Sequence, residues 1–251
     1  MHPENAMNMF KTIDNLKNSR NIIMDILSKY HNLGEIWFPN DIFVVSIMTR
    51  VNAINEAFVE LTSDIEDSGV AAFPLIRMQL DNLLYFYAGT IVDDFMELMG
   101  CFVNGDNWNR FKDKEENELK ESYLIDKLCE KFDTDIIRLI YKKASNYIHL
   151  STDHIAITLN KYGDEAVKST VGNYEASDHK EGLINMMLFI NGAILKIFAT
   201  DYSFLRYKNH KELEKMKLEH PTLSDMEILE KYGYSNEKLN NKFYNRLRIK
   251  E

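Results

Sequence analysis

The chain has 251 residues, of which 45% are apolar and 27% charged, and its formal net charge is −9. This length is sufficient for one large domain whose buried core needs neither a disulfide nor a metal ion to fold. The negative charge opposes non-specific attraction to nucleic acid over the whole surface, so binding of that kind would need a local basic patch.

Four Pro and ten Gly are few for a chain of this length and favour long uninterrupted helices. Apolar residues recur with the helical period, and no series of short alternating strands is present, so we predict an all-α, multi-helix bundle with long antiparallel helices. Cys101 and Cys129 lack a Cys-x-x-Cys spacing and are expected to be reduced core residues. The N-terminal residues show no secretory signal pattern, so we expect a cytoplasmic protein without membrane association.

The first hundred residues predict three long helices, over residues 7–31, 41–64 and 71–100. The third is apolar on almost every side and should be central to the bundle. It also carries Arg77 and Asp81, which are four residues apart and can meet. They form either an internal ion pair that fixes helix register or the polar wall of a cavity, where Arg77 would bind a phosphate or carboxylate.

A polar connector at 104–117 and a helix at 119–131 precede the most informative segment of the chain. Asp133 or Thr134 is expected to cap its helix, which ends around residues 149–151. One stripe of this helix is packed and is formed by Ile137, Tyr141, Ala144 and Ile148. Another is polar, because spacings of four, three and four residues align Arg138, Lys142, Ser145 and His149.

Beyond this helix, β-branched clusters on either side of Tyr162 predict a small β-hairpin insertion. The lipophilic segment from Gly182 to about Asp201 is interrupted by Asn185, Asn191 and Lys196, so we predict a buried bundle helix and not a membrane span. We divide the chain into a helical bundle domain, 1–205, and a short helical C-terminal appendage, 206–251.

The appendage shows two helix signals, of which the clearer is a capping box formed by Ser224 and Glu227. Two short helices separated by a turn superficially resemble a helix-turn-helix. The basic side chains at its end would suit phosphate contacts, which makes a DNA-binding regulator one alternative; they are Lys242, Arg246, Arg248 and Lys250.

The common cofactor and hydrolase motifs are absent, and we expect no cofactor. A metal site would need His149, Asp153 and His154 with a further ligand such as His179, and we expect none. The polar stripe itself fits metal-independent phosphodiester cleavage. An imidazole moves the proton of the attacking or leaving oxygen, and cations stabilise the charge that develops on phosphorus.

In this interpretation His149 is the general acid/base and Lys142 with Arg138 stabilises phosphate, while Ser145 and Asn146 orient the substrate. His154 is a further candidate binding residue, as are Arg77 and Asp81. The alternative is that the stripe is solvated, or that His149 hydrogen-bonds the Arg77/Asp81 helix as a structural lock.

The segment YKKASNYIHLS, preceded by AAFPLIRMQLDNLLYFYA, resembles a group of uncharacterised bacterial all-helical proteins. They share a Tyr-x-x-x-Ser-x-x-x-His core and an upstream Arg-x-x-x-Asp/Glu helix, and the resemblance covers much of residues 40–200. The group is distantly similar to the HEPN superfamily of helical bundles, whose nucleases carry an arginine and a histidine on one helix with four to six residues between them. Here His149 matches the histidine, and Lys142 stands in the place of the arginine.

The resemblance implies a bacterial defence or toxin-type protein, with metal-independent ribonuclease activity as the expected function. The implied partners are RNA or another anionic ligand, a second copy of the chain in a homodimer, and an antitoxin or other protein. The alternative from another class is a non-catalytic helical interaction or ligand-binding module.

Overall fold

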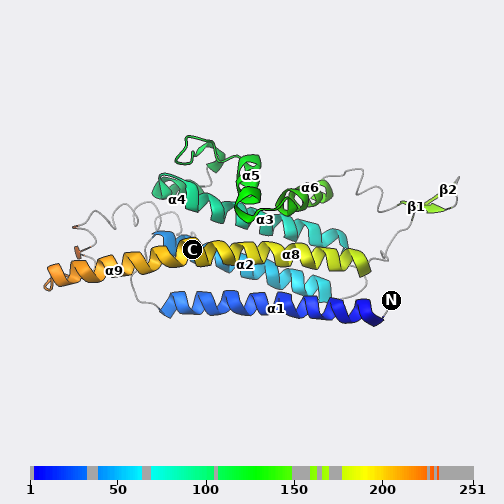
Figure 1. Cartoon of the computed structure of the whole chain (residues 1–251), viewed down its shortest axis with the longest axis horizontal. Helices are drawn as coiled ribbons and strands as arrows, with labels where there is room; N and C mark the ends of the chain where they lie inside the picture. Colours follow the sequence, from blue (N-terminus) through cyan, green and yellow to red (C-terminus); the bar gives the residue numbers. More distant parts are fainter. Residues whose placement is uncertain are drawn as a thin grey trace, which may run out of the picture.

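The computed structural model describes residues 3–32, 39–63, 69–104, 107–148, 159–162, 166–169, 177–224, 227–228 and 231. It confirms the predicted all-α multi-helix bundle (Figure 1). The elements are, in chain order, α1 (Pro3–Asn32), α2 (Pro39–Ser63), α3 (Gly69–Ile91), α4 (Phe95–Asn104), η1 (Trp108–Arg110), α5 (Glu121–Phe132), α6 (Ile136–Ile148), β1 (Leu159–Tyr162), β2 (Ala166–Ser169), α8 (Ser177–Ile197), η2 (Phe198–Tyr202) and α9 (Ser203–Glu219).

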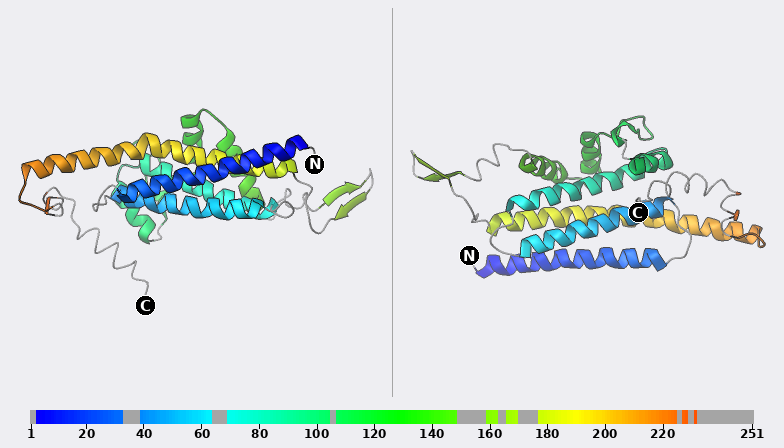
Figure 2. Two further views of the ribbon diagram at one scale, coloured as in Figure 1. Left: turned by 90° about the horizontal axis from the view of Figure 1, so that it is seen from below. Right: turned by 180° about the vertical axis from the view of Figure 1, so that it is seen from behind.

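Four long helices enclose the main core: α1 packs on α2 and α8, and α3 packs on the same two helices. The antiparallel arrangement holds for α1 with α2 and for α2 with α3, whereas α8 runs in the same direction as α1 and α3 (Figures 1 and 2). This direction arises because the chain between α3 and α8 returns to the end of the bundle where α3 begins. A second layer, made of α5 and α6, covers the outer side of α3.

The central position predicted for the third helix is confirmed for α3, whose side chains are buried toward both the bundle and the second layer. Its predicted C-terminal end at residue 100 is wrong, because α3 ends at Ile91 and α4 begins at Phe95. The Asp94 side chain accepts the backbone N–H of Glu97 at 2.9 Å, which is the geometry of a helix N-cap. Asp94 therefore starts a new helix within a continuous apolar run.

A buried chain of hydrogen bonds crosses the four-helix core and joins buried amide side chains from three of its helices. Gln79 Nε2 of α3 donates to Asn191 Oδ1 of α8 at 2.6 Å. Asn191 Nδ2 then donates to Asn55 Oδ1 of α2 and to Ser19 Oγ of α1, both at 3.2 Å. Each helix of the core contributes a polar group, so the chain of bonds restricts how the four can align.

Two helices are long and apolar enough to cross a membrane by length and composition alone, Asn40–Ser63 and Lys180–Tyr202. Their buried faces include Asn55 and Asn191, which are fully buried and hydrogen-bonded to each other. The prediction that the lipophilic segment after residue 182 is a bundle helix is confirmed, since α8 packs on α1, α2 and α3.

The short strands β1 and β2 pair antiparallel, with Leu159 opposite Ser169 and Tyr162 opposite Ala166. Their turn and flanks lie outside the described residues, so a hairpin insertion of defined extent stays a prediction. The division at residue 205 also stays a prediction, and it falls within α9, which projects beyond the bundle (Figure 1). The basic side chains predicted for the C-terminal helix lie outside the described residues.

The predicted capping box is confirmed: Ser224 N and Oγ donate to Glu227 Oε2 at 2.8 and 2.7 Å. These bonds lower the pKa of the Glu227 carboxyl. After the box, Ile228 is buried against Leu213 of α9 in a small cluster that also includes Met216 and Leu223. The appendage therefore has an apolar contact of its own.

Candidate functional site

The candidate site lies where the second layer meets α3. Arg77 and Asp81 are one turn apart on α3, and their side chains form the ion pair that their spacing predicted. The other terminal nitrogen of Arg77 donates to Glu121 Oε2 at 2.9 Å. Glu121 is the first residue of α5, so the guanidinium joins two carboxylates from different helices.

Tyr141 of α6 completes the cluster. Its hydroxyl donates to the same Glu121 oxygen at 2.9 Å, and the Arg77 guanidinium carbon lies 4.8 Å from the centre of its ring. Ser145 is half-buried and follows one turn further along α6. We call the four residues joined by these contacts the three-helix cluster: Arg77, Asp81, Glu121 and Tyr141.

The cluster is only partly shielded from water, because the exposed fractions of the Arg77, Asp81 and Glu121 side chains are 14, 24 and 37%. One guanidinium and two carboxylates give it a formal charge of −1. Both terminal nitrogens of Arg77 are bonded to protein carboxylates, so they are not directed at a ligand. Of the two interpretations of Arg77 and Asp81, the geometry favours the internal ion pair.

The surroundings of the Tyr141 hydroxyl favour its protonated form. Burial raises the pKa of Tyr141, and the hydrogen bond to Glu121 and the charge of that carboxylate raise it further. The charge of Arg77 and the nearby Ser145 hydroxyl lower the pKa of Tyr141 but do not cancel this shift. Tyr141 therefore remains a neutral hydrogen-bond donor to Glu121 under ordinary conditions.

The structure places the polar stripe of α6 mainly toward solvent. Arg138 lies outside the three-helix cluster, where it pairs with Asp126 of α5 at 2.8 Å and with Asp135. Lys142 is exposed and makes no ion pair with any other described residue. Asn146 is half-buried. The packed stripe is confirmed at Ile137 and Ala144, both fully buried on the opposite side.

The predicted general acid/base falls outside this description. His149 and His154 lie beyond the last described residue of α6, as does Asp153, and the side chain of His179 is likewise outside. Their roles stay predictions. Within the described ranges, no group of three or more His, Cys, Asp or Glu side chains is placed to hold a metal ion.

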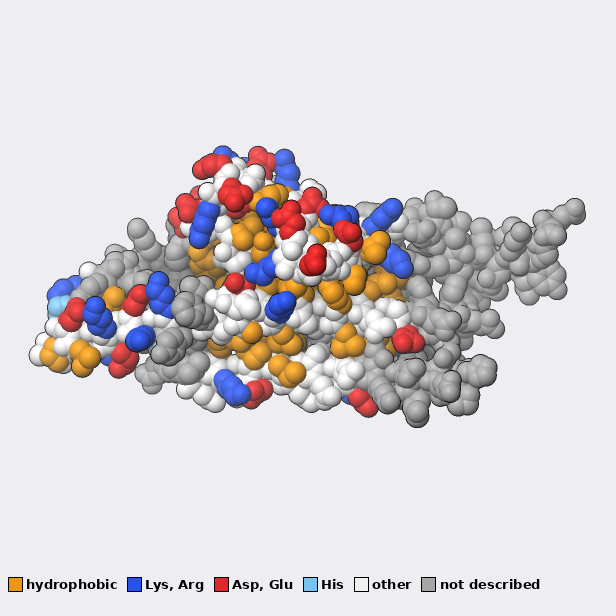
Figure 3. Space-filling model, viewed as in Figure 1, with side chains coloured by type: hydrophobic (Ala, Val, Ile, Leu, Met, Phe, Trp, Pro, Cys, Tyr) orange, Lys and Arg blue, Asp and Glu red, His pale blue; other side chains and the backbone are white. Residues whose placement is uncertain are grey.

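Charges are mixed over the second layer. On the face shown in Figure 3, acidic and basic side chains alternate over α5 and α6, and the described surface there has no broad area of one sign. Such a surface lacks the extended basic footprint of proteins that bind nucleic acid mainly through phosphates. RNA binding on this face would have to depend on a small number of neighbouring basic side chains.

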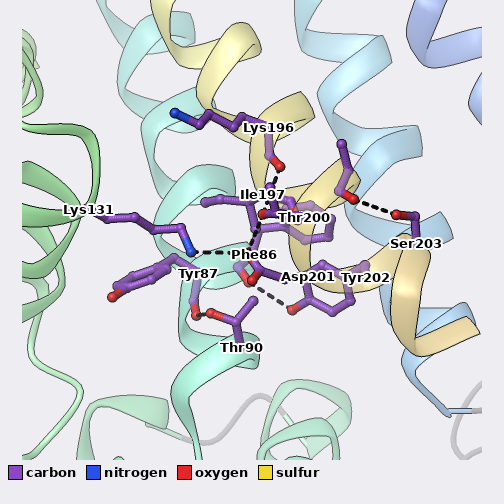
Figure 4. A network of polar contacts seen from close by, with 11 residues as sticks. Phe86, Tyr87, Thr90, Lys131, Lys196, Ile197, Thr200, Asp201, Tyr202 and Ser203 are labelled. Atoms are coloured by element: carbon purple, nitrogen blue, oxygen red, sulfur yellow. Dashed lines mark hydrogen bonds and ion pairs between the residues drawn. The ribbon is translucent and has the colours of Figure 1, made fainter. Parts of the chain in front are cut away.

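A second polar cluster surrounds η2, a π-helical turn between α8 and α9 (Figure 4). Asp201 accepts from Lys131 of α5 at 3.1 Å and from Thr200 at 2.9 Å. The hydroxyl of Tyr202 donates to the Phe86 carbonyl of α3 at 2.8 Å, and its ring stacks on that of Phe86 with centroids 4.4 Å apart. These contacts hold the π-helical turn η2 against α3 and α5.

Sequence reasoning missed Glu121 as a site residue. It stands in a charged segment whose pattern indicates a solvated face, and its partners are 44 and 20 positions away. Comparisons of the chain with models of known families, with characterised proteins and with solved structures gave no significant match.

Proposed function

We propose that this chain is a HEPN-like protein of the bacterial defence or toxin type and a metal-independent endoribonuclease of the cytoplasm. One observation carries the proposal: Arg77, Asp81 and Tyr141, which are three of the five motif positions of the resemblance, come from two distant segments and lie in one cluster. The other two positions are Ser145, one turn after Tyr141 on α6, and His149, four residues later in the sequence.

We assign the role of His149 from the motif, and the other roles from the surroundings of the described side chains. His149 is the general acid/base, and the exposed ammonium of Lys142 is the cation that stabilises the phosphorane. Arg138 has a secondary role in stabilising the phosphate, because its guanidinium must first leave Asp126 and Asp135. These ion pairs are exposed to water and therefore weak. Arg77 has a structural role, holding α6 against α3 and α5.

The test is cleavage of a labelled RNA by the purified full chain in the presence of EDTA. His149→Ala should lower the cleavage rate by about 10²- to 10⁴-fold, the usual contribution of general acid–base catalysis. Lys142→Ala should also lower it, whereas Lys143→Ala, an exposed neighbour outside the stripe, is the matched control. Circular dichroism must show each variant folded. Cleavage by His149→Ala at the wild-type rate would refute the proposal.

A second candidate function, a non-catalytic interaction module, is favoured by the outer face of α6. Ile136 and Leu139 are exposed there by 45 and 58%, although most large apolar side chains of the second layer are buried. If this face forms a homodimer, Leu139→Glu should convert dimer to monomer in sedimentation velocity. Leu218→Glu, at an 84% exposed position on α9, should not. A monomeric wild-type protein would count against this candidate.

A further inference from the structure

A strip of α3 between α2 and the second layer reaches solvent. At about 100° per residue, five residues with exposed or half-buried side chains fall on one side of this helix. On one flank of them Arg77 contacts the second layer, and on the other Asn82 contacts α2. We call these residues the α3 strip: Ala71, Pro74, Met78, Asp81 and Tyr85. Because Asp81 also belongs to the three-helix cluster, the strip runs along α3 past the candidate site.

Aromatic side chains surround the end of the strip at Tyr85. Its ring centroid lies 5.0 Å from that of Trp108 in η1 and 5.4 Å from that of Phe102 in α4. All three side chains are half-buried, so each retains contact with water. Partly exposed tryptophan and tyrosine rings are the groups on which the bases of single-stranded nucleic acids stack.

A guanidinium group lies at the edge of the strip. Arg50 of α2 is half-buried, and its Nη1 donates to Asn82 Oδ1 at 2.6 Å. Among the residues that the structure describes, Arg50 bonds this neutral amide alone, and no carboxylate neutralises its charge. A guanidinium has several N–H donors in one plane, so Arg50 can still bind a phosphate.

We propose that the α3 strip binds single-stranded RNA, with one base stacked on Trp108 and a neighbouring phosphate paired with Arg50. This inference rests on the proposed function and assigns the surface that holds the substrate beside the second layer. An uncompensated cation beside partly exposed rings favours a nucleic acid over an acidic protein, because a nucleotide presents a planar base and a phosphate together. In a duplex the bases stack on one another, so the surface requires a single strand.

The first experiment observes the stacking directly. The chain has two tryptophans, so Trp37→Phe leaves Trp108 as the single source of tryptophan fluorescence. The probes are oligouridylate and oligothymidylate of equal length, in EDTA. Stacking and ion pairing do not use the 2′-hydroxyl, so both strands should quench Trp108. The DNA strand lacks the attacking 2′-hydroxyl, so its binding is measured without cleavage.

The second experiment removes the stacking ring and measures the anisotropy of a labelled oligothymidylate. Trp108→Leu should weaken binding about five- to hundredfold, the usual effect of losing one stacked base. Phe132→Leu is the matched control, because Phe132 is a half-buried ring of α5 that packs against Lys196, outside the strip. Circular dichroism must show both variants folded.

Arg50 is tested by the salt dependence of the same binding, which responds to a lost charge and not to lost packing. Each phosphate contact of a single strand contributes about 0.7 to the slope of log affinity against log salt concentration, so Arg50→Met should reduce the slope by about that amount. Arg20→Met should leave the slope unchanged, because Arg20 lies on α1 and is already paired with Glu56 at 2.7 Å.

The outcomes separate the binding surface from the ribonuclease. Absence of Trp108 quenching by either strand, or a wild-type salt slope in Arg50→Met, would overturn the inference. Cleavage of RNA without quenching of Trp108 would also overturn it and leave the proposed ribonuclease standing. Quenching by both strands with no cleavage of the RNA would refute the ribonuclease and leave the binding surface standing.

Discussion

The Asp113 carboxylate is the most densely hydrogen-bonded acid in the described part of the chain. Its Oδ1 accepts the backbone N–H groups of Glu115 and Asn117, both at 2.9 Å, and its Oδ2 accepts the Tyr123 hydroxyl. Burial alone would raise the pKa of Asp113, but these hydrogen bonds outweigh it and the net pKa is lowered. The turn between η1 and α5 therefore depends on the ionised form.

This lowered pKa gives a pH dependence with a definite sign. The ionised carboxylate stabilises the fold at pH values above its unfolded pKa of about 3.9, and the contribution is lost as the pH falls through the lower folded value. Urea unfolding should therefore show a loss of wild-type stability between pH 5 and 3 that is smaller in Asp113→Asn. Identical pH profiles for the two proteins would contradict the prediction.

Among individual residues, the sequence could predict the ion pair between Arg77 and Asp81 but not the one between Arg77 and Glu121. The first pair lies on one helix, and the helical period alone brings its members together. Glu121 meets Arg77 only because α5 crosses α3, and helix crossing depends on the complete set of packed side chains. A single sequence contains no local signal for such a contact.

The helices themselves were predictable, because long apolar stripes and few helix breakers define them, whereas some of their ends were not. The end of α3 was missed because Val92 continues the apolar run, and only Asp94 indicates a new start. The π-turn η2 was missed for a related reason. Its sequence has ordinary helical character, and the bulge is held by distant groups on α3 and α5.

The contact between α3 and η2 is close enough to require glycine at position 89. A Cβ atom at Gly89 would lie 2.4 Å from the Tyr202 hydroxyl and 2.9 Å from Phe43. Tyr202 is fully buried and bonded to Phe86, so it has little room to move. Overpacking of this kind usually costs about 1–3 kcal/mol.

Gly89→Ala should therefore lower the free energy of unfolding by that amount in urea denaturation. Gly192→Ala is the matched control, because a Cβ there meets nothing within 4 Å and α8 should gain about 0.5–1 kcal/mol from alanine. In a Tyr202→Phe background the cost of Gly89→Ala should be smaller, since the closest atom is gone. A Gly89→Ala variant as stable as the wild type would show that η2 can shift freely.

At the scale of the whole molecule, apolar burial makes the four-helix core stable but does not by itself select one alignment. Apolar side chains repeat along α8, so a shift by one turn would still bury them. The amide chain removes this freedom, because it runs in one direction from Arg50 through Asn82 and Gln79 to Asn191 and Asn55. A shifted helix would leave these groups buried without partners.

Asn191→Ala interrupts this chain at its centre and should lower the free energy of unfolding by about 3 kcal/mol, since the Asn55 acceptor loses its partner in the core and the Gln79 donor keeps only the Val51 carbonyl at 3.4 Å. Asn185→Ala, at an exposed position on the same helix, should change it by less than about 0.5 kcal/mol. Urea denaturation of both variants measures the difference. Equal stability of the two would mean that apolar packing alone aligns α8, and that the buried amides contribute nothing to the choice of fold.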